Sequence, residues 1–297
     1  RSTLFPYTTL FRSGSWDGTV LVDRDAPGAR AFGRGVVLED LRDPEAGERM
    51  RVDIALQGRA SVQILEQYDM VASDRSRLQR LAKGKVIRVN LGGYDVIISR
   101  TGYTGEKFSY EIFVHPDKAP ALWTDLLNIG SAFGILPCGL AARDSLRIES
   151  GLPLYGHELA GPYNYRLSEV GFSHFVKIYK PWFIGRSAFL SEVEEKKRRL
   201  VRFTIKGKSQ RLAQPGDPLF DEKGKVVGVV TSCSIDSEGG VVGLAMVDIA
   251  FAVEGTEFVI YQNAARTTMK KLDELKLGDK LPMPSTAVVL RRYPKLA

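Results

Sequence analysis

The chain has 297 residues, of which 44% are hydrophobic and 26% charged, and its formal net charge is +7. These values predict a globular protein with room for two or more hydrophobic cores, and no apolar run approaches the roughly 20 residues of a membrane span. The modest basic excess suits an anionic ligand or an acidic partner protein, while the lack of a clustered basic helix argues against nucleic acid.

The first thirteen residues, RSTLFPYTTLFRS, show neither helical nor strand periodicity. From Thr3 onward they resemble the translation of a short-read sequencing adapter, and cloning scars must be kept out of fold reasoning. We therefore interpret residues 1–13 as a non-native scar and expect the native reading frame to begin upstream. A natural disordered N-terminus is the alternative.

The next part of the chain predicts short strands and one helix. Apolar or alternating runs between Gly, Asp and Pro are typical of strands, and they occur at Val20–Val22, Val36–Leu38 and Val52–Leu56. Helical spacing follows over Ala60–Tyr68. Two β-rich runs, Lys85–Asn90 and Tyr94–Ser99, flank a glycine pair that permits positive φ, which predicts a hairpin.

Strand and helix patterns alternate up to about residue 150. Tyr110–Val114 alternates as a strand and places Glu111 on the face opposite Tyr110. A helix is expected over Lys118–Ile129, with an apolar face of Ala119, Leu122, Trp123, Leu126 and Leu127. A second helix is expected over Gly139–Ser150, closing at Gly151. Because no βαβ unit repeats, the pattern predicts an α+β sheet with packed helices.

The C-terminal third changes character. A charged helix over Ser187–Arg199 is expected to connect two domains. Beyond it, short strands divided by Gly, Pro and Asp predict a small antiparallel barrel or sandwich, at Leu200–Ile205, Val226–Ser232, Val241–Val247 and Glu257–Tyr261. We therefore predict an α+β domain over 14–180, a linker over 181–199 and a β domain over 200–297.

A glycine-bracketed turn and a strand carboxylate are the first candidate binding groups. The turn, RTGYTGE at residues 100–106, lets the backbone approach a ligand closely and lets Tyr103 stand clear of the turn. Glu111 lies within an otherwise apolar strand, where a carboxylate can accept paired hydrogen bonds from a pterin-like ring. A structural turn and a carboxylate on the wet face of a sheet are the alternatives.

Two arginines follow on the second helix. Arg143 and Arg147 are four residues apart, so both guanidinium groups can face one side and bind a carboxylate such as a folate tail. Local pairing, for instance of Asp144 with Arg147, is the alternative.

The loop LPLYGHEL, residues 152–159, contributes Tyr155, His157 and Glu158 between Pro and Gly. Loops often carry binding groups, although a lone histidine is more often structural. The sequence has no P-loop, no G-x-G-x-x-G and no Ser–His–Asp order, which argues against an NTPase, a Rossmann dehydrogenase and a hydrolase. Two separated cysteines and three histidines offer no metal-ligand spacing, so we expect no metal and a reduced, cytoplasmic compartment.

In this order, the motifs RTGYTGE, YE, GLAARDSLR, GLPLYGHEL and KPWFIGR resemble the aminomethyltransferase (glycine-cleavage T protein) family over nearly all of residues 50–297. The resemblance implies a folate-binding α+β domain and a C-terminal antiparallel β-barrel. It implies that Glu111 binds the pterin ring of tetrahydrofolate and that Arg143 contacts the folate or its tail. Tyr103 and Tyr155 match residues near the same pocket, and Tyr293 matches a residue that closes it.

The implied reaction moves a one-carbon unit from an aminomethyl group on a lipoylated carrier (H-type) protein to tetrahydrofolate, which is a cosubstrate, with release of ammonia and without a metal. Two other functions use the same fold: tetrahydrofolate-dependent demethylation of small molecules, and a non-enzymatic folate-binding role in iron–sulfur cluster assembly. The latter is disfavoured because its cysteine motif has no counterpart at Cys138 or Cys233.

The sequence departs from the family pattern in two places. One extra residue separates Gly105 from Glu111 (GEKFSYE), which indicates a divergent branch with a different one-carbon donor. The family's functional aspartate lies in a segment upstream of anything recognisable here. We therefore assign no catalytic residue, and we expect this chain alone to bind reduced folate weakly and not to turn over.

Overall fold

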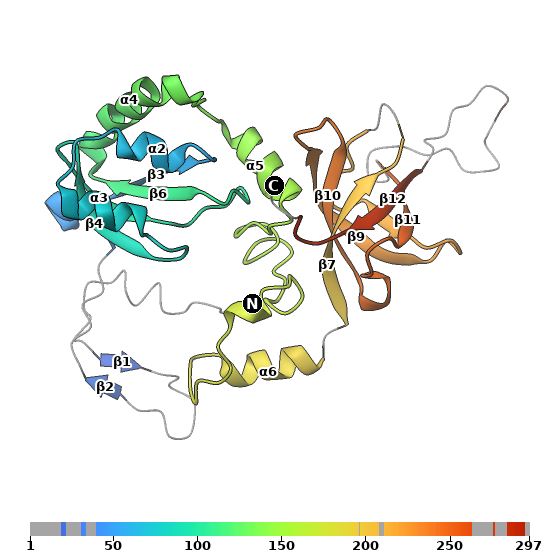
Figure 1. Cartoon of the computed structure of the whole chain (residues 1–297). Coiled ribbons are helices and arrows are strands. Elements are labelled where there is room, and N and C mark those ends of the chain that lie inside the picture. Colours follow the sequence, from blue (N-terminus) through green and yellow to red (C-terminus); the bar gives the residue numbers. More distant parts are fainter. Residues whose placement is uncertain are drawn as a thin grey trace.

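The computed structural model describes residues 19–21, 31–33, 40–195, 197–207, 211–262, 276 and 284–294. In these residues the chain forms a sheet domain and a closed β-barrel, with helix α5 between them (Figure 1). This architecture confirms the predicted α+β class and the C-terminal barrel. The predicted scar and the strand expected at Val36–Leu38 lie outside the described residues.

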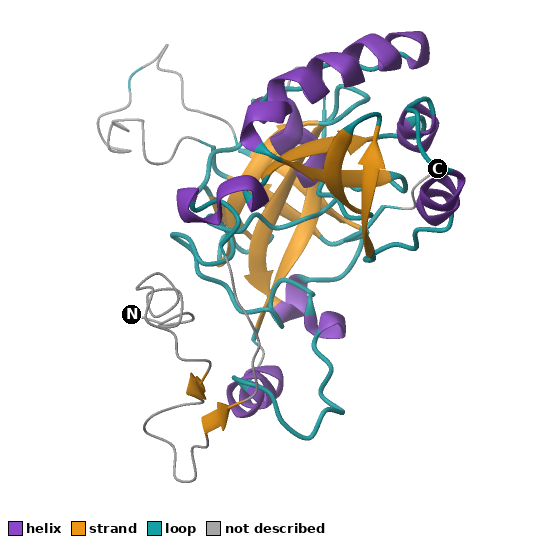
Figure 2. Cartoon of the chain, turned by 90° about the vertical axis from the view of Figure 1, so that its left-hand side faces the viewer, coloured by secondary structure: helices purple, strands orange, loops and turns teal. Residues whose placement is uncertain are grey.

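A short two-stranded unit precedes the sheet domain. Strand β1 (Thr19–Leu21) overlaps the expected strand at Val20–Val22 and pairs antiparallel with β2 (Ala31–Gly33). Both strands lie apart from the main sheet and from the barrel (Figures 1 and 2). The chain then passes through the short helix η1 (Pro44–Arg49), where the Asp43 side chain accepts a hydrogen bond from Glu45 N–H.

The main sheet has the order β3-β6-β5-β4, and each neighbouring pair is antiparallel. Its strands are β3 (Val52–Gln57), β4 (Val86–Leu91), β5 (Tyr94–Ser99) and β6 (Ser109–Val114). Because side chains alternate along a strand, one face of the sheet carries the core. Ile54, Ile98 and Ile112 are buried on that face. The predicted hairpin is confirmed, since Gly92 and Gly93 turn at φ +61° and +95°.

Helices complete the core of the sheet domain. These are α2 (Ser61–Glu66), α3 (Ala72–Gln79) and α4 (Ala119–Gly130), the last flanked by η2 (Pro116–Lys118) and η3 (Ser131–Phe133). Leu122 and Leu126 of α4 are buried, and each contributes about 1.5–3 kcal/mol by leaving water. The prediction that Trp123 belongs to the apolar face was wrong, because 41% of this residue is exposed.

Helix α5 (Leu140–Glu149) leads from the sheet domain to the barrel. It ends at Gly151, as predicted, with φ +76°. A loop with the short helix η4 (Ser173–Phe175) then reaches α6 (Arg186–Glu194). The charged helix expected to extend to Arg199 stops earlier, because Arg198 and Arg199 already pair with β10.

The barrel closes in the order β10-β7-β12-β11-β8-β9. Its elements are β7 (Arg198–Ile205), β8 (Pro218–Phe220), β9 (Val226–Ile235), β10 (Val241–Asp248), η5 (Ile249–Phe251), β11 (Glu257–Ile260) and β12 (Ser285–Leu290). β8 and β12 were not predicted. Buried Phe203 of β7 covers its cross-strand partner Gly243 of β10, where an added Cβ would lie 2.3 Å from the ring.

Candidate functional site

The face of the main sheet opposite its core carries Glu111, the residue that the sequence analysis predicts to bind the pterin ring. Glu111 lies on β6, opposite Ala55 of β3 and Ser99 of β5, and is half-buried. The Thr101 hydroxyl lies within hydrogen-bond distance of a Glu111 carboxylate oxygen and 2.8 Å from Ser99 Oγ. The start of the glycine turn therefore holds the carboxylate in place on an open sheet face.

Asp53 is a second carboxylate on this face, and the sequence analysis missed it. It pairs in register with Phe113, two residues beyond Glu111 on the same face of β6. Burial raises the pKa of Asp53, the charge of Glu111 raises it further, and Arg143 opposes both. Asp53 as a whole is exposed to solvent, so the burial that acts on its carboxyl group is only partial. The face thus combines two acids and one guanidinium group.

Tyr103 and Arg143 lie together beside these acids. The Arg143 guanidinium lies 5.6 Å from the centre of the Tyr103 ring, a cation–π distance. The Tyr103 hydroxyl donates to Pro153 O at 2.6 Å, and burial raises its pKa, so the phenol is neutral. Arg143 is exposed. Its guanidinium group is therefore available to an anion that enters beside the ring.

The two glycines of the turn serve the chain's own packing. A Cβ added at Gly102 would lie 2.3 Å from Ser109 Cβ. One added at Gly105, which has φ +83°, would lie 2.0 Å from Ser150 Oγ. The glycines therefore allow the turn to pack against β6 and the end of α5, which positions Tyr103.

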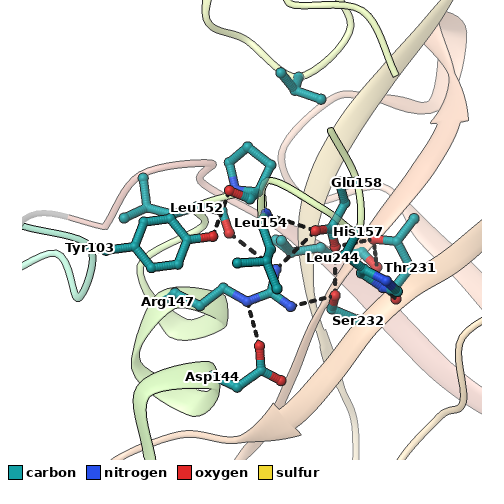
Figure 3. A network of polar contacts seen from close by, with 12 residues as sticks. Tyr103, Asp144, Arg147, Leu152, Leu154, His157, Glu158, Thr231, Ser232 and Leu244 are labelled. Carbon is teal, nitrogen blue, oxygen red and sulfur yellow. Dashed lines mark hydrogen bonds and ion pairs between the residues drawn. The ribbon is translucent and has the colours of Figure 1, made fainter. Parts of the chain in front are cut away.

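Arg147 is buried and bound within the protein, so the structure separates the roles of the two arginines (Figure 3). Its Nε donates to Asp144 at 2.6 Å, its Nη1 lies 3.1 Å from Glu158, and its Nη2 donates to Ser232 at 2.8 Å. The local pairing of Asp144 with Arg147, named above as the alternative, is confirmed.

Glu158 is the centre of this network and joins the loop after α5 to the barrel (Figure 3). It is fully buried and accepts hydrogen bonds from Leu154 N–H at 2.8 Å, Thr231 Oγ1 at 3.0 Å and Ser232 Oγ at 2.5 Å. Burial alone would raise its pKa, but Arg147 and these donors hold the pKa below its usual value. Glu158 therefore remains ionised as a structural group.

His157 has a similar structural role. Its Nε2 lies 2.7 Å from Thr231 O, and its ring meets Tyr163 edge-on at 5.2 Å. The loop 152–159 thus fastens α5 to β9. The sequence analysis did not predict this role for Glu158. The one local sign of it is a carboxylate four residues after Leu154, whose N–H it binds.

The remaining two predicted site residues, Tyr155 and Tyr293, lie outside the group formed by Glu111, Tyr103 and Arg143. Tyr155 is 67% exposed in the loop before Glu158. Tyr293 follows β12, and its hydroxyl lies 3.4 Å from where a Cβ would stand at Gly171. Its neighbour Arg292 is half-buried, and its guanidinium atoms Nε and Nη1 are shielded from solvent, which lowers the pKa of the guanidinium group to about 10. Across the described residues, no contact joins either tyrosine to the face that bears Glu111.

In the part of the chain that the structure describes, no three His, Cys, Asp or Glu side chains gather in a way that could hold a metal ion. Likewise, none of the helices described is long and apolar enough to cross a membrane.

Two family profiles match the chain: the GCVT N-terminal domain over residues 45–180 and the glycine cleavage T-protein C-terminal barrel domain over 198–274. The aminomethyltransferase of Halothermothrix orenii is 39% identical over 223 residues, which cover 74% of this chain and 59% of the relative. That of Streptomyces avermitilis is 36% identical over 236 residues, or 78% of this chain and 59% of the relative.

A solved structure agrees with these sequence matches. The crystal structure of glycine cleavage system aminomethyltransferase T from Bartonella henselae superposes with a TM-score of 0.62 at 28% identity, over 82% of this chain and 59% of that one. The chain thus spans about three fifths of the length of these relatives. With both domains matched in order and in fold, the chain belongs to the glycine cleavage T-protein (aminomethyltransferase) family.

Proposed function

We propose that the whole protein is a tetrahydrofolate-dependent aminomethyltransferase of glycine cleavage. The observation that carries the proposal is the grouping of Glu111, Tyr103 and Arg143 at one sheet face, in a chain of this family. The named activity of the relatives supports the reaction class.

Each residue of the proposed site has a binding role that fits its chemistry. Glu111 would accept paired hydrogen bonds from the N–H and amino groups of the pterin ring. Such bonds are strong because the accepting carboxylate is charged. Exposed Arg143 would bind an anionic part of the folate with its planar fork. Tyr103 would support that guanidinium group through its ring. We extend the proposed site to Tyr155 and Tyr293 on the resemblance alone.

In the proposed reaction, N5 and then N10 of tetrahydrofolate form bonds to the aminomethyl carbon carried by a lipoylated partner protein. The bonds from this carbon to the departing ammonia and to the lipoyl sulfur break, and the two N–H protons of tetrahydrofolate leave with the ammonia and the lipoyl thiol. Tetrahydrofolate supplies the nucleophile and accepts the carbon. The chain's own residues would bind and orient it: Glu111 fixes the ring end, and the Arg143–Tyr103 pair fixes the ligand along α5.

A demethylase of the same family is the second candidate, favoured by the extra residue between Gly105 and Glu111. The segment between these two residues contains Phe108, whose ring centre lies 5.2 Å from the Arg100 guanidinium carbon. Supplying the whole protein with a lipoylated carrier or with methylated amines, and following folate consumption, separates the two candidates.

The first test of the site is Glu111→Ala in the whole protein, with tetrahydrofolate binding measured by anaerobic calorimetry. Loss of the paired charge-assisted hydrogen bonds, each worth about 1.5–3 kcal/mol, should weaken binding by at least roughly 100-fold. Glu222→Ala, an exposed glutamate in the β8–β9 turn, is the matched control and should bind like the unchanged protein. Unchanged affinity in Glu111→Ala would remove Glu111 from the site.

A further inference from the structure

A basic groove of about 310 Å³ lies between α3 and the edge strand β4. Both elements stand on the side of the sheet domain away from the barrel (Figure 1). The residues that carry its charge, its hydroxyl group and its apolar floor are Ser76, Arg77, Arg80, Leu81, Lys85 and Val86. The basic residues are close together in the sequence, but their side chains line one groove only after the helix folds onto the strand.

Two of the cations in the groove are free to bind an anion. Arg77 is already engaged, since its Nη1 donates to Asp74 Oδ1 and to Arg88 O, each at 3.1 Å. Arg80 and Lys85 are exposed, and no described residue forms an ion pair with either. The groove therefore offers uncompensated positive charge next to the apolar side chain of Val86, which is 61% exposed.

The backbone of β4 is also open at this point. Arg88 C=O and Asn90 N–H point away from β5, because they bond to Arg77 and to Asp74 on α3. Backbone groups alternate along an antiparallel ladder, so Val86, two residues earlier, faces the same outer edge. Among the described residues, no hydrogen bond engages the Val86 N–H or C=O on that edge. Helix α3 thus covers the later part of the edge and leaves its beginning open.

We propose that this groove docks an extended acidic segment of a partner protein, which pairs with the β4 edge at Val86 and places its carboxylates against Arg80 and Lys85. Edge strands accept added strands through their main-chain groups, and alternate side chains then give specificity. An extended segment presents carboxylates on one side and apolar side chains on the other, which suits the free cations and the apolar floor. This inference is independent of the folate site.

The structure favours a peptide over nucleic acid. No aromatic side chain lines the groove, so bases have no stacking surface there. Two free cations form a short patch, whereas backbone binding to nucleic acid relies on several phosphate contacts.

The test is fluorescence anisotropy with a labelled hexapeptide of alternating glutamate and valine, titrated with the whole protein. The double variant Arg80→Glu/Lys85→Glu should bind at least roughly tenfold more weakly. Lys223→Glu/Lys225→Glu makes the same change of charge on the exposed β8–β9 turn and should bind like the unchanged protein. Val86→Pro keeps every charge but removes the edge N–H, and it should also weaken binding.

Circular dichroism must first show that each variant is folded. Equal weakening in both charge-reversed proteins would mean general attraction, and would overturn the proposal. A thymidine oligonucleotide that binds with the same dependence on Arg80 and Lys85, together with unchanged peptide binding by Val86→Pro, would assign the groove to nucleic acid instead. A dimer in sedimentation that disappears only in Arg80→Glu/Lys85→Glu would assign it to a second copy of the chain.

Discussion

At the scale of single residues, the Asp53–Glu111 pair sets the electrostatics of the proposed folate face. Partial burial of the Asp53 carboxyl group and the like charge of Glu111 on the same sheet face both oppose its ionisation, which accounts for the raised pKa of Asp53. Arg143 offsets part of that repulsion. A ligand that donates hydrogen bonds to Glu111 therefore also lies near Asp53, which holds its own proton more tightly than a free aspartate does.

Asp53→Asn tests this coupling. Because the folded-state pKa of Asp53 is raised from 3.8, its ionisation costs stability as the pH rises through and above that value. Asp53→Asn should therefore stabilise the protein near pH 7 and have no such effect near pH 3. Since Asp53 is exposed, we expect less than about 1 kcal/mol. Thermal unfolding at the two pH values measures it, and an equal shift at both would contradict the coupling.

At the scale of elements, the C-terminal half of α5 is held against β9 and the turn that follows it. Ser145 Oγ lies 2.5 Å from Ser234 Oγ, Arg147 donates to Ser232, and Glu149 accepts from Ser237 Oγ at 2.7 Å. These three polar contacts fix the end of the helix on the barrel. Since Arg143 stands on the same helix, this docking also sets where its guanidinium group lies.

The end of α5 is tested by Gly151→Ala. Gly151 has φ +76°, and an added Cβ would lie 2.0 Å from Arg292 O, in the segment that carries Tyr293. Gly134→Ala is the matched control, because Gly134 has φ +74° with nothing within 4 Å. Both changes incur backbone strain of about 1 kcal/mol, and Gly151→Ala should lose at least about 1–2 kcal/mol more through the clash. Denaturant unfolding measures the difference, and equal losses would show that the contact is unimportant.

At the scale of the whole molecule, the two domains share one buried seam. A cluster of apolar residues links α5, the loop after it and the outer face of the barrel: Ile148, Tyr165, Val170, Leu200, Val242, Leu244 and Met246. The buried Arg147–Glu158 pair lies within the same junction. Removing one partner of such a pair leaves the other charge buried without a counter-ion, which destabilises the fold. Replacing both partners with apolar residues avoids that desolvation cost.

Glu158→Gln should therefore destabilise the protein by about 3–5 kcal/mol and split calorimetric unfolding into separate transitions of the two domains. Because the folded-state pKa of Glu158 is lowered, its contribution is present above 4.5 and is lost as the pH falls through the folded value. The deficit of Glu158→Gln should shrink accordingly in acid. Arg147→Met/Glu158→Leu should lose less free energy of unfolding than Glu158→Gln. A larger loss in the double variant would refute the argument that an unpaired buried charge causes the destabilisation.

The sequence alone determined the features that depend on local patterns. Alternation in Tyr110–Val114 assigned Glu111 to the face opposite the core, and the glycine pair at Gly92 and Gly93 set the hairpin. The apolar run Val241–Val247 predicted a strand, and the structure places it in β10. The ordered motifs identified the family. Each depends on residues close together in the chain.

Only the tertiary structure decided which charged groups remain free. Arg143 and Arg147 share one helix and looked equivalent, yet Ser232 and Glu158 bind only the second. Short strands such as β8 (Pro218–Phe220) are defined by their ladder partners rather than by their own three residues. The basic groove likewise required α3 to fold onto β4. In the first two cases burial and pairing depend on groups distant in sequence. In the third they depend on how a helix folds onto the next strand, and local periodicity carries no information about either.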